Sequence, residues 1–163
     1  MNQKLKVIRI KPGAICVYAT PVQITSVISY GIAVSLFDPR LKIGGLCHFL
    51  YPQLPENVPP TGKYAIPALF AQIQLLKKQG SNLQNLEANL YGGTDHPSKN
   101  PSFRAISKNG LQIAIQYLRK NKIKIGSLDF GGATGRKLMF NVNTGETMIA
   151  KVRHLELADW QCA

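Results

Sequence analysis

Acidic residues are scarce in this sequence. It has 8 Asp and Glu against 20 Lys and Arg, which leaves a formal net charge of +12 over 163 residues. Such a surplus could serve nucleic acid, an anionic membrane surface, an acidic protein partner, or solubility alone. Apolar residues still make up 45% of the chain, which argues against disorder. We therefore expect a single domain over residues 1–163, with the charge carried on a folded surface.

Dense basic tracts are absent as well. The two densest groups of cations are 77–78 and 119–124, and neither interleaves aromatic residues with cations as single-strand binders do. Nucleic acid is therefore disfavoured as a partner. A basic nucleic-acid-binding domain stays as a remote alternative that the charge alone supports.

No apolar run is long enough to cross a membrane. The longest, 27–37, is interrupted by two serines and a tyrosine and falls far below the ~20 residues that a spanning helix needs. The N-terminal segment carries Lys and Arg through its apolar positions, unlike a signal peptide. The sequence therefore predicts a cytoplasmic protein without membrane insertion.

Cysteines are few and poorly spaced for chemistry that needs several of them. Cys16, Cys47 and Cys162 form an odd set without a C-x-x-C pair, which is typical of free thiols in a reducing compartment. The histidines do not complete a metal site with them. The glycine-rich segment 131–136 lacks the spacing of a phosphate-binding loop and precedes a predicted strand. We expect no bound metal and no cofactor.

The hydrophobic pattern predicts many strands and two main helices. Helical spacing of apolar residues covers 66–78, with a glycine at position 80 suited to end that helix, and a second helix is expected from about residue 107 to 122. Strands are expected at 6–10, 15–18, 31–38, 41–50, 83–91, 123–130, 137–142 and 147–152. Together these elements predict an α/β (α+β) layered sandwich with a mixed β-sheet.

His48 is the first candidate for chemistry, because it lies in an apolar strand beside two glycines. A histidine with an ordinary pKa near 6.5 suits proton transfer at neutral pH. The plainer interpretation is a half-buried structural histidine, and the residues alone leave both open. Cys47 cannot serve as its nucleophile, because neighbours on a strand point to opposite faces. Cys47 is therefore expected to be a small packed side chain.

Several segments, taken together and in order, resemble the CheD family of chemoreceptor glutamine deamidases. The segments are 25–38, 43–52, 62–65, 86–93, 108–109, 129–132, 135–136 and 143–145. The resemblance runs from about residue 6 to 152 and implies a CheD-like cysteine-hydrolase fold. It also implies hydrolysis of glutamine side-chain amides on methyl-accepting chemotaxis receptors. In that family a cysteine thiolate attacks the amide, a histidine activates the thiol, and a threonine holds the histidine.

Two of the three family residues carry over, and the nucleophile does not. The histidine falls on His48 and the threonine on Thr25. The family pattern Gly-Ser-Cys reads Ser29, Tyr30, Gly31 here, with Gly31 17 positions before His48, as the family spacing requires. Glycine has no side chain, so no covalent intermediate can form at that position. Tyr30 is expected to fill the space where a substrate amide would lie.

The resemblance therefore implies a catalytically impaired member that still binds chemoreceptor cytoplasmic domains or a CheC-type phosphatase. We expect a Thr25–His48 hydrogen bond to survive beside the missing nucleophile. The main alternative is an active amidohydrolase with another nucleophile, for which Ser29 is the nearest candidate and Cys16 a distant one. The charge of +12 then suits Glu-rich receptor helices.

Overall fold

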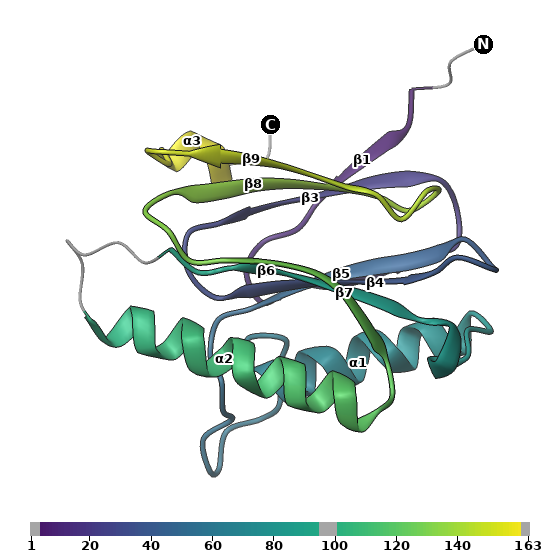
Figure 1. Ribbon diagram of the computed structural model, residues 1–163, viewed down its shortest axis with the longest axis horizontal. Coiled ribbons are helices and arrows are strands. Elements are labelled where there is room, and N and C mark those ends of the chain that lie inside the picture. The colour runs from purple at the N-terminus through teal and green to yellow at the C-terminus, as the bar shows by residue number, and fades with distance from the viewer. Residues whose placement is uncertain (1–3, 95–100, 161–163) are drawn as a thin grey trace.

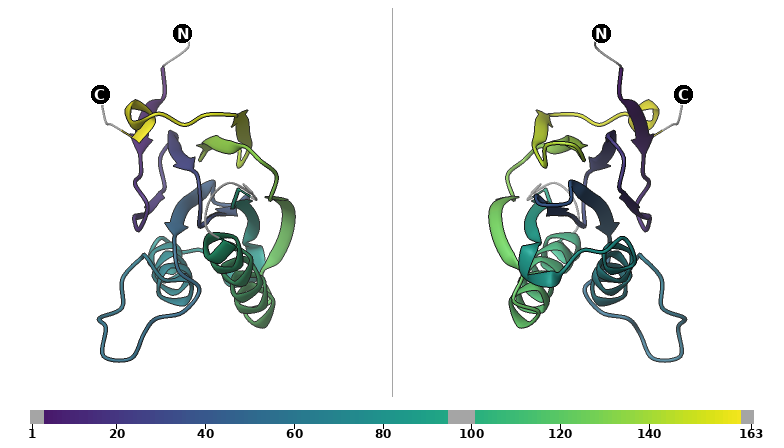
Figure 2. Two further views of the ribbon diagram at one scale, coloured as in Figure 1. Left: turned by 90° about the vertical axis from the view of Figure 1, so that its left-hand side faces the viewer. Right: turned by 90° about the vertical axis from the view of Figure 1, so that its right-hand side faces the viewer.

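Two β-sheets lie face to face, and two long helices cover the outer face of one of them (Figure 1). This computed structural model describes residues 4–94 and 101–160. Figure 2 shows the three layers from the two ends, with the loop 53–63 projecting past the helices. The layers confirm the predicted α/β sandwich with mixed sheets and two main helices.

One sheet has five strands in the order β2-β5-β4-β6-β7, and the other has four in the order β1-β3-β8-β9. The pairs β1–β3 and β6–β7 are parallel, and the other neighbours are antiparallel. The elements are β1 (Lys6–Arg9), β2 (Ile15–Tyr18), β3 (Val22–Ile28), β4 (Ile32–Asp38), β5 (Ile43–Phe49), α1 (Ala65–Lys78), a 3₁₀ turn (Leu83–Asn85), β6 (Glu87–Gly92), α2 (Pro101–Lys120), β7 (Lys124–Phe130), β8 (Gly135–Asn141), β9 (Thr147–Val152) and α3 (Leu157–Trp160).

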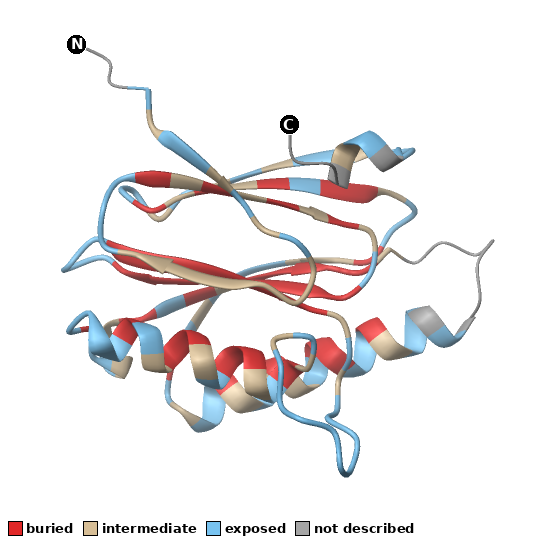
Figure 3. Cartoon of the chain, turned by 180° about the vertical axis from the view of Figure 1, so that it is seen from behind, coloured by how far each residue is buried: buried red, intermediate tan, exposed pale blue. Residues whose placement is uncertain are grey.

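Burial explains why the central strands are apolar throughout. Every residue of β4 and β5 is buried, because the four-stranded sheet packs on one face and the helices on the other (Figure 3). Strand β3 instead alternates buried and half-buried residues, as expected when one face of a strand meets the core. The core is thus divided into a cluster under the helices and a cluster between the sheets, where Phe37 and Phe140 meet edge to face.

The helices begin and end largely as their sequences dictate. Helix α1 ends at Lys78, and Gly80 follows with a φ of +97°, the left-handed conformation that favours glycine there. Helix α2 begins at Pro101, six residues before the predicted start, and proline is favoured in the first turn because its missing N–H costs nothing. Within the described residues, no helix combines the length and the apolar character needed to span a bilayer.

Besides the short helix α3, the pattern failed to predict strand β3. Its inward positions are Val22, Ile24, Ser26 and Ile28, so a hydroxyl interrupts the apolar side of the alternation. Ser26 is only 3% exposed, and its partner in the core is His48. The break in the pattern therefore marks the candidate site.

Candidate functional site

The candidate site lies at the end of the sandwich where β3 leads into β4. The connecting residues are held by neighbours from distant parts of the chain. The Gly31 N–H donates to Ser107 Oγ at 3.1 Å, and the Gly31 carbonyl accepts from the Gly93 N–H at 3.0 Å. The Ser29 carbonyl accepts from both the N–H and the hydroxyl of Thr94, at 3.2 and 2.8 Å. The turn that carries the nucleophile position is therefore fixed from several sides.

His48 is sealed inside this site, with both ring nitrogens engaged. The residue is 1% exposed, its Nε2 lies 3.2 Å from the Tyr30 carbonyl oxygen, and its Nδ1 lies 3.2 Å from Ser26 Oγ. A carbonyl oxygen only accepts, so Nε2 carries the proton and donates it to Tyr30. Nδ1 then has the lone pair, which accepts from the Ser26 hydroxyl. No lone pair of the ring is left to take a proton from a nucleophile.

Burial also fixes the charge of the ring. Desolvation lowers the pKa of His48 from 6.5 to about 4, and the hydrogen bond to Tyr30 opposes this only in part. The imidazole is therefore neutral at physiological pH. In this conformation His48 is a neutral, inward-facing histidine whose two ring nitrogens both have internal partners.

The structure places Ser26, and not Thr25, against His48. Successive residues of a strand point to opposite faces, so the Ser26 side chain enters the core while Thr25 faces away from it. Thr25 Oγ1 donates to the Ile8 carbonyl at a long 3.5 Å and lines a groove on the outer face of the sheet. The expected Thr25–His48 hydrogen bond is therefore replaced by a Ser26–His48 bond.

Gly31, which the family resemblance places at the nucleophile position, has a backbone conformation that a cysteine would not adopt readily. Its φ is +82°, and a Cβ added there would lie 2.4 Å from the Phe49 carbonyl oxygen. Real Cβ atoms do not approach a backbone oxygen so closely, and positive φ is strained for residues with side chains. In this conformation the position has no space for a side chain.

Neither described cysteine is suited to act as a nucleophile at neutral pH. Cys47 is buried in the cluster under the helices, on the face of β5 opposite His48, which confirms its predicted packing role. Burial raises its pKa to about 12. Burial likewise raises the pKa of Cys16 to about 11, although its Sγ lies 3.8 Å from the Leu46 carbonyl oxygen. Thiols with such pKa values are not nucleophiles at neutral pH.

Tyr30 reaches His48 through its backbone. Its carbonyl oxygen accepts from the ring, while its side chain is 37% exposed. The expectation that the Tyr30 side chain fills the space of a substrate amide stays a prediction. Ser107, which is 2% exposed and contacts Gly31, was not predicted as a site residue, because 76 positions separate the two in sequence.

An ion pair with a buried arginine anchors the loop next to the site. Arg136 is 1% exposed and donates to both carboxylate oxygens of Asp129, at 3.3 and 3.0 Å, and to the Gly131 carbonyl at 2.7 Å. These contacts hold the pKa of Asp129 below its usual range. The Gly131 N–H in turn donates to the Gly93 carbonyl at 2.9 Å, and Gly93 holds Gly31. Arg136 therefore supports the site through a chain of backbone hydrogen bonds.

Many of the cations lie far from this site, at the opposite end of β4 and β5. At this end of the sheet Phe37 of β4 lies opposite Glu87 of β6, and Glu87 lies opposite Lys124 of β7. Gly80, just after α1, lies beside Leu41. The turn 39–42 and the C-terminal ends of both helices are therefore close together. The exposed cations there are Arg40, Lys42, Lys77, Lys78, Arg119, Lys120, Lys122 and Lys124. Several also offset the negative ends of the helix dipoles. Among the described residues, no cluster of His, Cys, Asp and Glu is arranged to hold a metal ion.

Comparison with known proteins identifies the family. The family model described as CheD chemotactic sensory transduction matches residues 53–151. A probable chemoreceptor glutamine deamidase CheD 1 of Anaeromyxobacter dehalogenans is 31% identical over 86% of this chain and 81% of its own length. A probable chemoreceptor glutamine deamidase CheD of Methanococcus vannielii is 30% identical over 89% of this chain and 95% of its own. A probable CheD 2 of Geobacter sulfurreducens is 26% identical over 95% and 96%. The chain therefore belongs to the CheD family.

Proposed function

We propose that this chain is a CheD-family protein that binds the cytoplasmic domains of chemoreceptors without deamidating them by the family's cysteine chemistry. The relatives are named as probable chemoreceptor glutamine deamidases, which supports the receptor as partner. The proposed loss of catalysis is inferred from two residues, Gly31 and His48. The first has no room for a side chain, and the second has no free lone pair.

Covalent deamidation needs a thiolate, a base that takes its proton, and access for the amide. Here the ring would first have to break its bond to Ser26 before Nδ1 could act as a base. With 1% of its surface exposed, His48 also meets no solvent or substrate. Catalysis would therefore require a rearranged turn at 29–31, and that turn is held by Thr94, Gly93 and Ser107.

A CheC-type phosphatase is the second proposed partner, and it follows from the family resemblance. Binding to either protein needs only a surface, so it is compatible with the loss of the nucleophile. An active amidohydrolase with Ser29 as nucleophile is the competing hypothesis. The Ser29 backbone carbonyl accepts two hydrogen bonds from Thr94. These bonds restrain the backbone shift that would be needed to bring the Ser29 hydroxyl into the space at Gly31.

Incubation with a chemoreceptor cytoplasmic fragment that carries glutamines at its modification sites is expected to leave the mass of that fragment unchanged. Each deamidation would add about one dalton, because an amide becomes an acid, so intact-mass spectrometry reads the result directly. The fragment is nevertheless expected to bind the protein in a saturable manner by isothermal titration calorimetry. A CheD-family protein with the Gly-Ser-Cys pattern serves as the positive control for conversion.

Two outcomes would contradict the proposed function. Conversion by the unaltered chain that disappears in His48→Ala would show that the histidine is a working catalytic residue. If no receptor fragment binds, whether its modification sites carry Gln or Glu, the receptor is not a partner.

Gly31→Cys is expected not to restore deamidation and to destabilise the fold. A side chain at φ +82° costs about 1–2 kcal/mol, and the contact with the Phe49 oxygen adds roughly 1–3 kcal/mol of overpacking. Gly132→Cys is a matched control, because Gly132 has a φ of +80° but nothing within 4 Å of its added Cβ. Urea denaturation should therefore show a larger loss for Gly31→Cys than for Gly132→Cys. Equal losses, or turnover by Gly31→Cys, would show that the turn accepts a thiol.

A further inference from the structure

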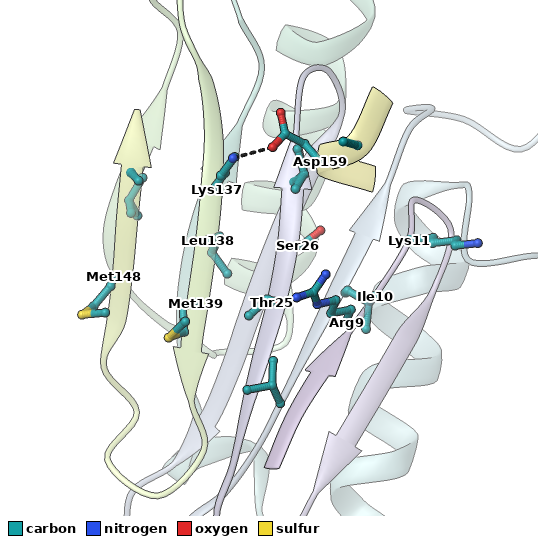
Figure 4. Close-up of a pocket in the computed structure, with 15 residues that line it drawn as sticks. Arg9, Ile10, Lys11, Thr25, Ser26, Lys137, Leu138, Met139, Met148 and Asp159 are labelled. Carbon is teal, nitrogen blue, oxygen red and sulfur yellow. Dashed lines mark ion pairs between the residues drawn. The ribbon is translucent and has the colours of Figure 1, made fainter. Parts of the chain in front are cut away.

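The outer face of the four-stranded sheet is hollowed into a groove of about 710 Å³ (Figure 4). Helices α1 and α2 cover the outer face of the other sheet, whereas over this one the described elements place only the short α3 at its side (Figures 1 and 2). Thr25 faces the groove, and Ser26 also lines it, but the Ser26 hydroxyl points to the other side of β3, where it lies 3.2 Å from His48 Nδ1. The groove and the candidate site therefore lie on opposite sides of this strand.

The floor of the groove is apolar and exposed. It is formed by outward residues of all four strands: Val7, Val27, Met139, Met148 and Ala150. Met148 is 66% exposed and Val7 44% exposed, and Met148 pairs directly with Met139 across β8 and β9. Contiguous exposed apolar surface in a concave setting marks interaction sites, and methionines adapt to the shape of a partner.

The rim of the groove is basic. Arg9 lies beside Thr25 in the groove, whereas Lys11 lines its edge and its side chain is directed outward (Figure 4). Among the described lining residues the one acid is Asp159, and it already pairs with Lys137. Within the described part of the chain, Arg9 and Lys11 make no ion pair. The groove therefore complements an acidic partner with an apolar stripe.

We propose that this groove binds an acidic amphipathic helix of a partner protein. The apolar stripe of that helix lies on Met139 and Met148, and carboxylates on its flank meet Arg9. A sheet face offers side chains and no free backbone groups, so a helix stripe suits it better than an added strand. Helix on sheet is also the packing that α1 and α2 use on the other side of the sandwich.

A second copy of the chain is a poorer occupant. A two-fold interface places the same surface on both sides. Among the described lining residues of this surface the charged groups are cations and Asp159, which already pairs with Lys137. Two copies would therefore bring Arg9 and Lys11 toward like charges. An acidic helix satisfies both the apolar floor and the basic rim.

The test uses a fluorescein-labelled peptide of about 18 residues, with leucines at helical spacing and glutamates on both flanks of the stripe. Fluorescence anisotropy is expected to show saturable binding to the full chain that weakens as salt is added. Met148→Glu and Arg9→Glu are each expected to weaken binding about tenfold or more. The same peptide with lysines in place of its glutamates is expected not to bind.

Two matched variants control for charge and apolar area elsewhere. Lys120→Glu makes the same charge change as Arg9→Glu at the distant basic end, and Phe70→Glu removes an apolar side chain that is 54% exposed on α1. Both should bind the peptide like the unaltered chain. The proposal is overturned by absent binding, by equal binding of the lysine peptide, or by Met148→Glu binding normally. It is also overturned if Met148→Glu abolishes a concentration-dependent dimer in analytical ultracentrifugation, which would make the face a contact between copies.

Discussion

Arg136→Met is expected to lower the free energy of unfolding by about 3 kcal/mol, and up to about 5 kcal/mol. The guanidinium is 1% exposed, and its removal leaves the Asp129 carboxylate and the Gly131 carbonyl without their main donor. Lys151 remains 3.4 Å from Asp129, and this carboxylate is 26% exposed, so the lower end of the range is the expected value. Urea denaturation followed by circular dichroism measures the loss.

Lys124→Met is the matched control, because it also removes one cation from an ion pair. Its partner Glu87 lies 3.7 Å away, and the two side chains are 74% and 47% exposed. Exposed pairs contribute about 0–1 kcal/mol, so this variant should unfold almost like the unaltered chain. A loss below about 1 kcal/mol for Arg136→Met would contradict the buried ion pair as a support of the fold.

The same variant is expected to loosen the candidate site. The Arg136 guanidinium donates to the Gly131 carbonyl, and backbone hydrogen bonds then link Gly131 to Gly93 and Gly93 to Gly31. Hydrogen–deuterium exchange should therefore become faster in the segments 29–31 and 92–94 of Arg136→Met, and should stay slow in Lys124→Met. Unchanged exchange in those segments would show that the turn is fixed without the ion pair.

The local hydrophobic pattern predicted most of the fold, because in most elements it reflects which faces are buried. The apolar runs that became β4 and β5 have both faces covered, and the helical stripe of α1 packs on them. The alternation rule alone placed Cys47 on the face of β5 away from His48, and the structure confirms it. Strand β3 escaped detection because Ser26 occupies an inward position, and only the distant His48 explains a hydroxyl there.

The candidate site was predicted in part, since its geometry depends on contacts that no local pattern contains. The family resemblance pointed to His48 and predicted a missing nucleophile at Gly31, but it assigned the role of holding the ring to Thr25, whereas the structure places Ser26 there. A side chain at Gly31 would meet the Phe49 carbonyl across the sheet, and the Gly31 N–H donates to Ser107 in α2. Neither contact is visible in a sequence without its fold.

The unaltered chain is expected to lose about 2–3 kcal/mol of stability between about pH 7 and pH 4.5 through His48 alone. In the folded chain burial lowers the pKa of the ring to about 4, whereas the unfolded chain has the ordinary value of 6.5. Between these two values the unfolded chain binds a proton that the folded chain does not, so acid favours unfolding. Asp129 stays charged over this range, because Arg136 holds its pKa below the ordinary 3.8.

His48→Gln is expected to remove most of this pH dependence, because glutamine keeps a donor and an acceptor for Tyr30 and Ser26 but does not titrate. His154→Gln is the matched control at an exposed histidine and should keep the full loss. Free energies of unfolding from urea titrations at several pH values decide the matter. If His48→Gln loses as much stability in acid as the unaltered chain, the ring is already charged or hydrated in the folded protein. A charged or hydrated ring could still serve an incoming nucleophile, so that outcome would also weaken the sealed histidine on which the proposed loss of catalysis rests.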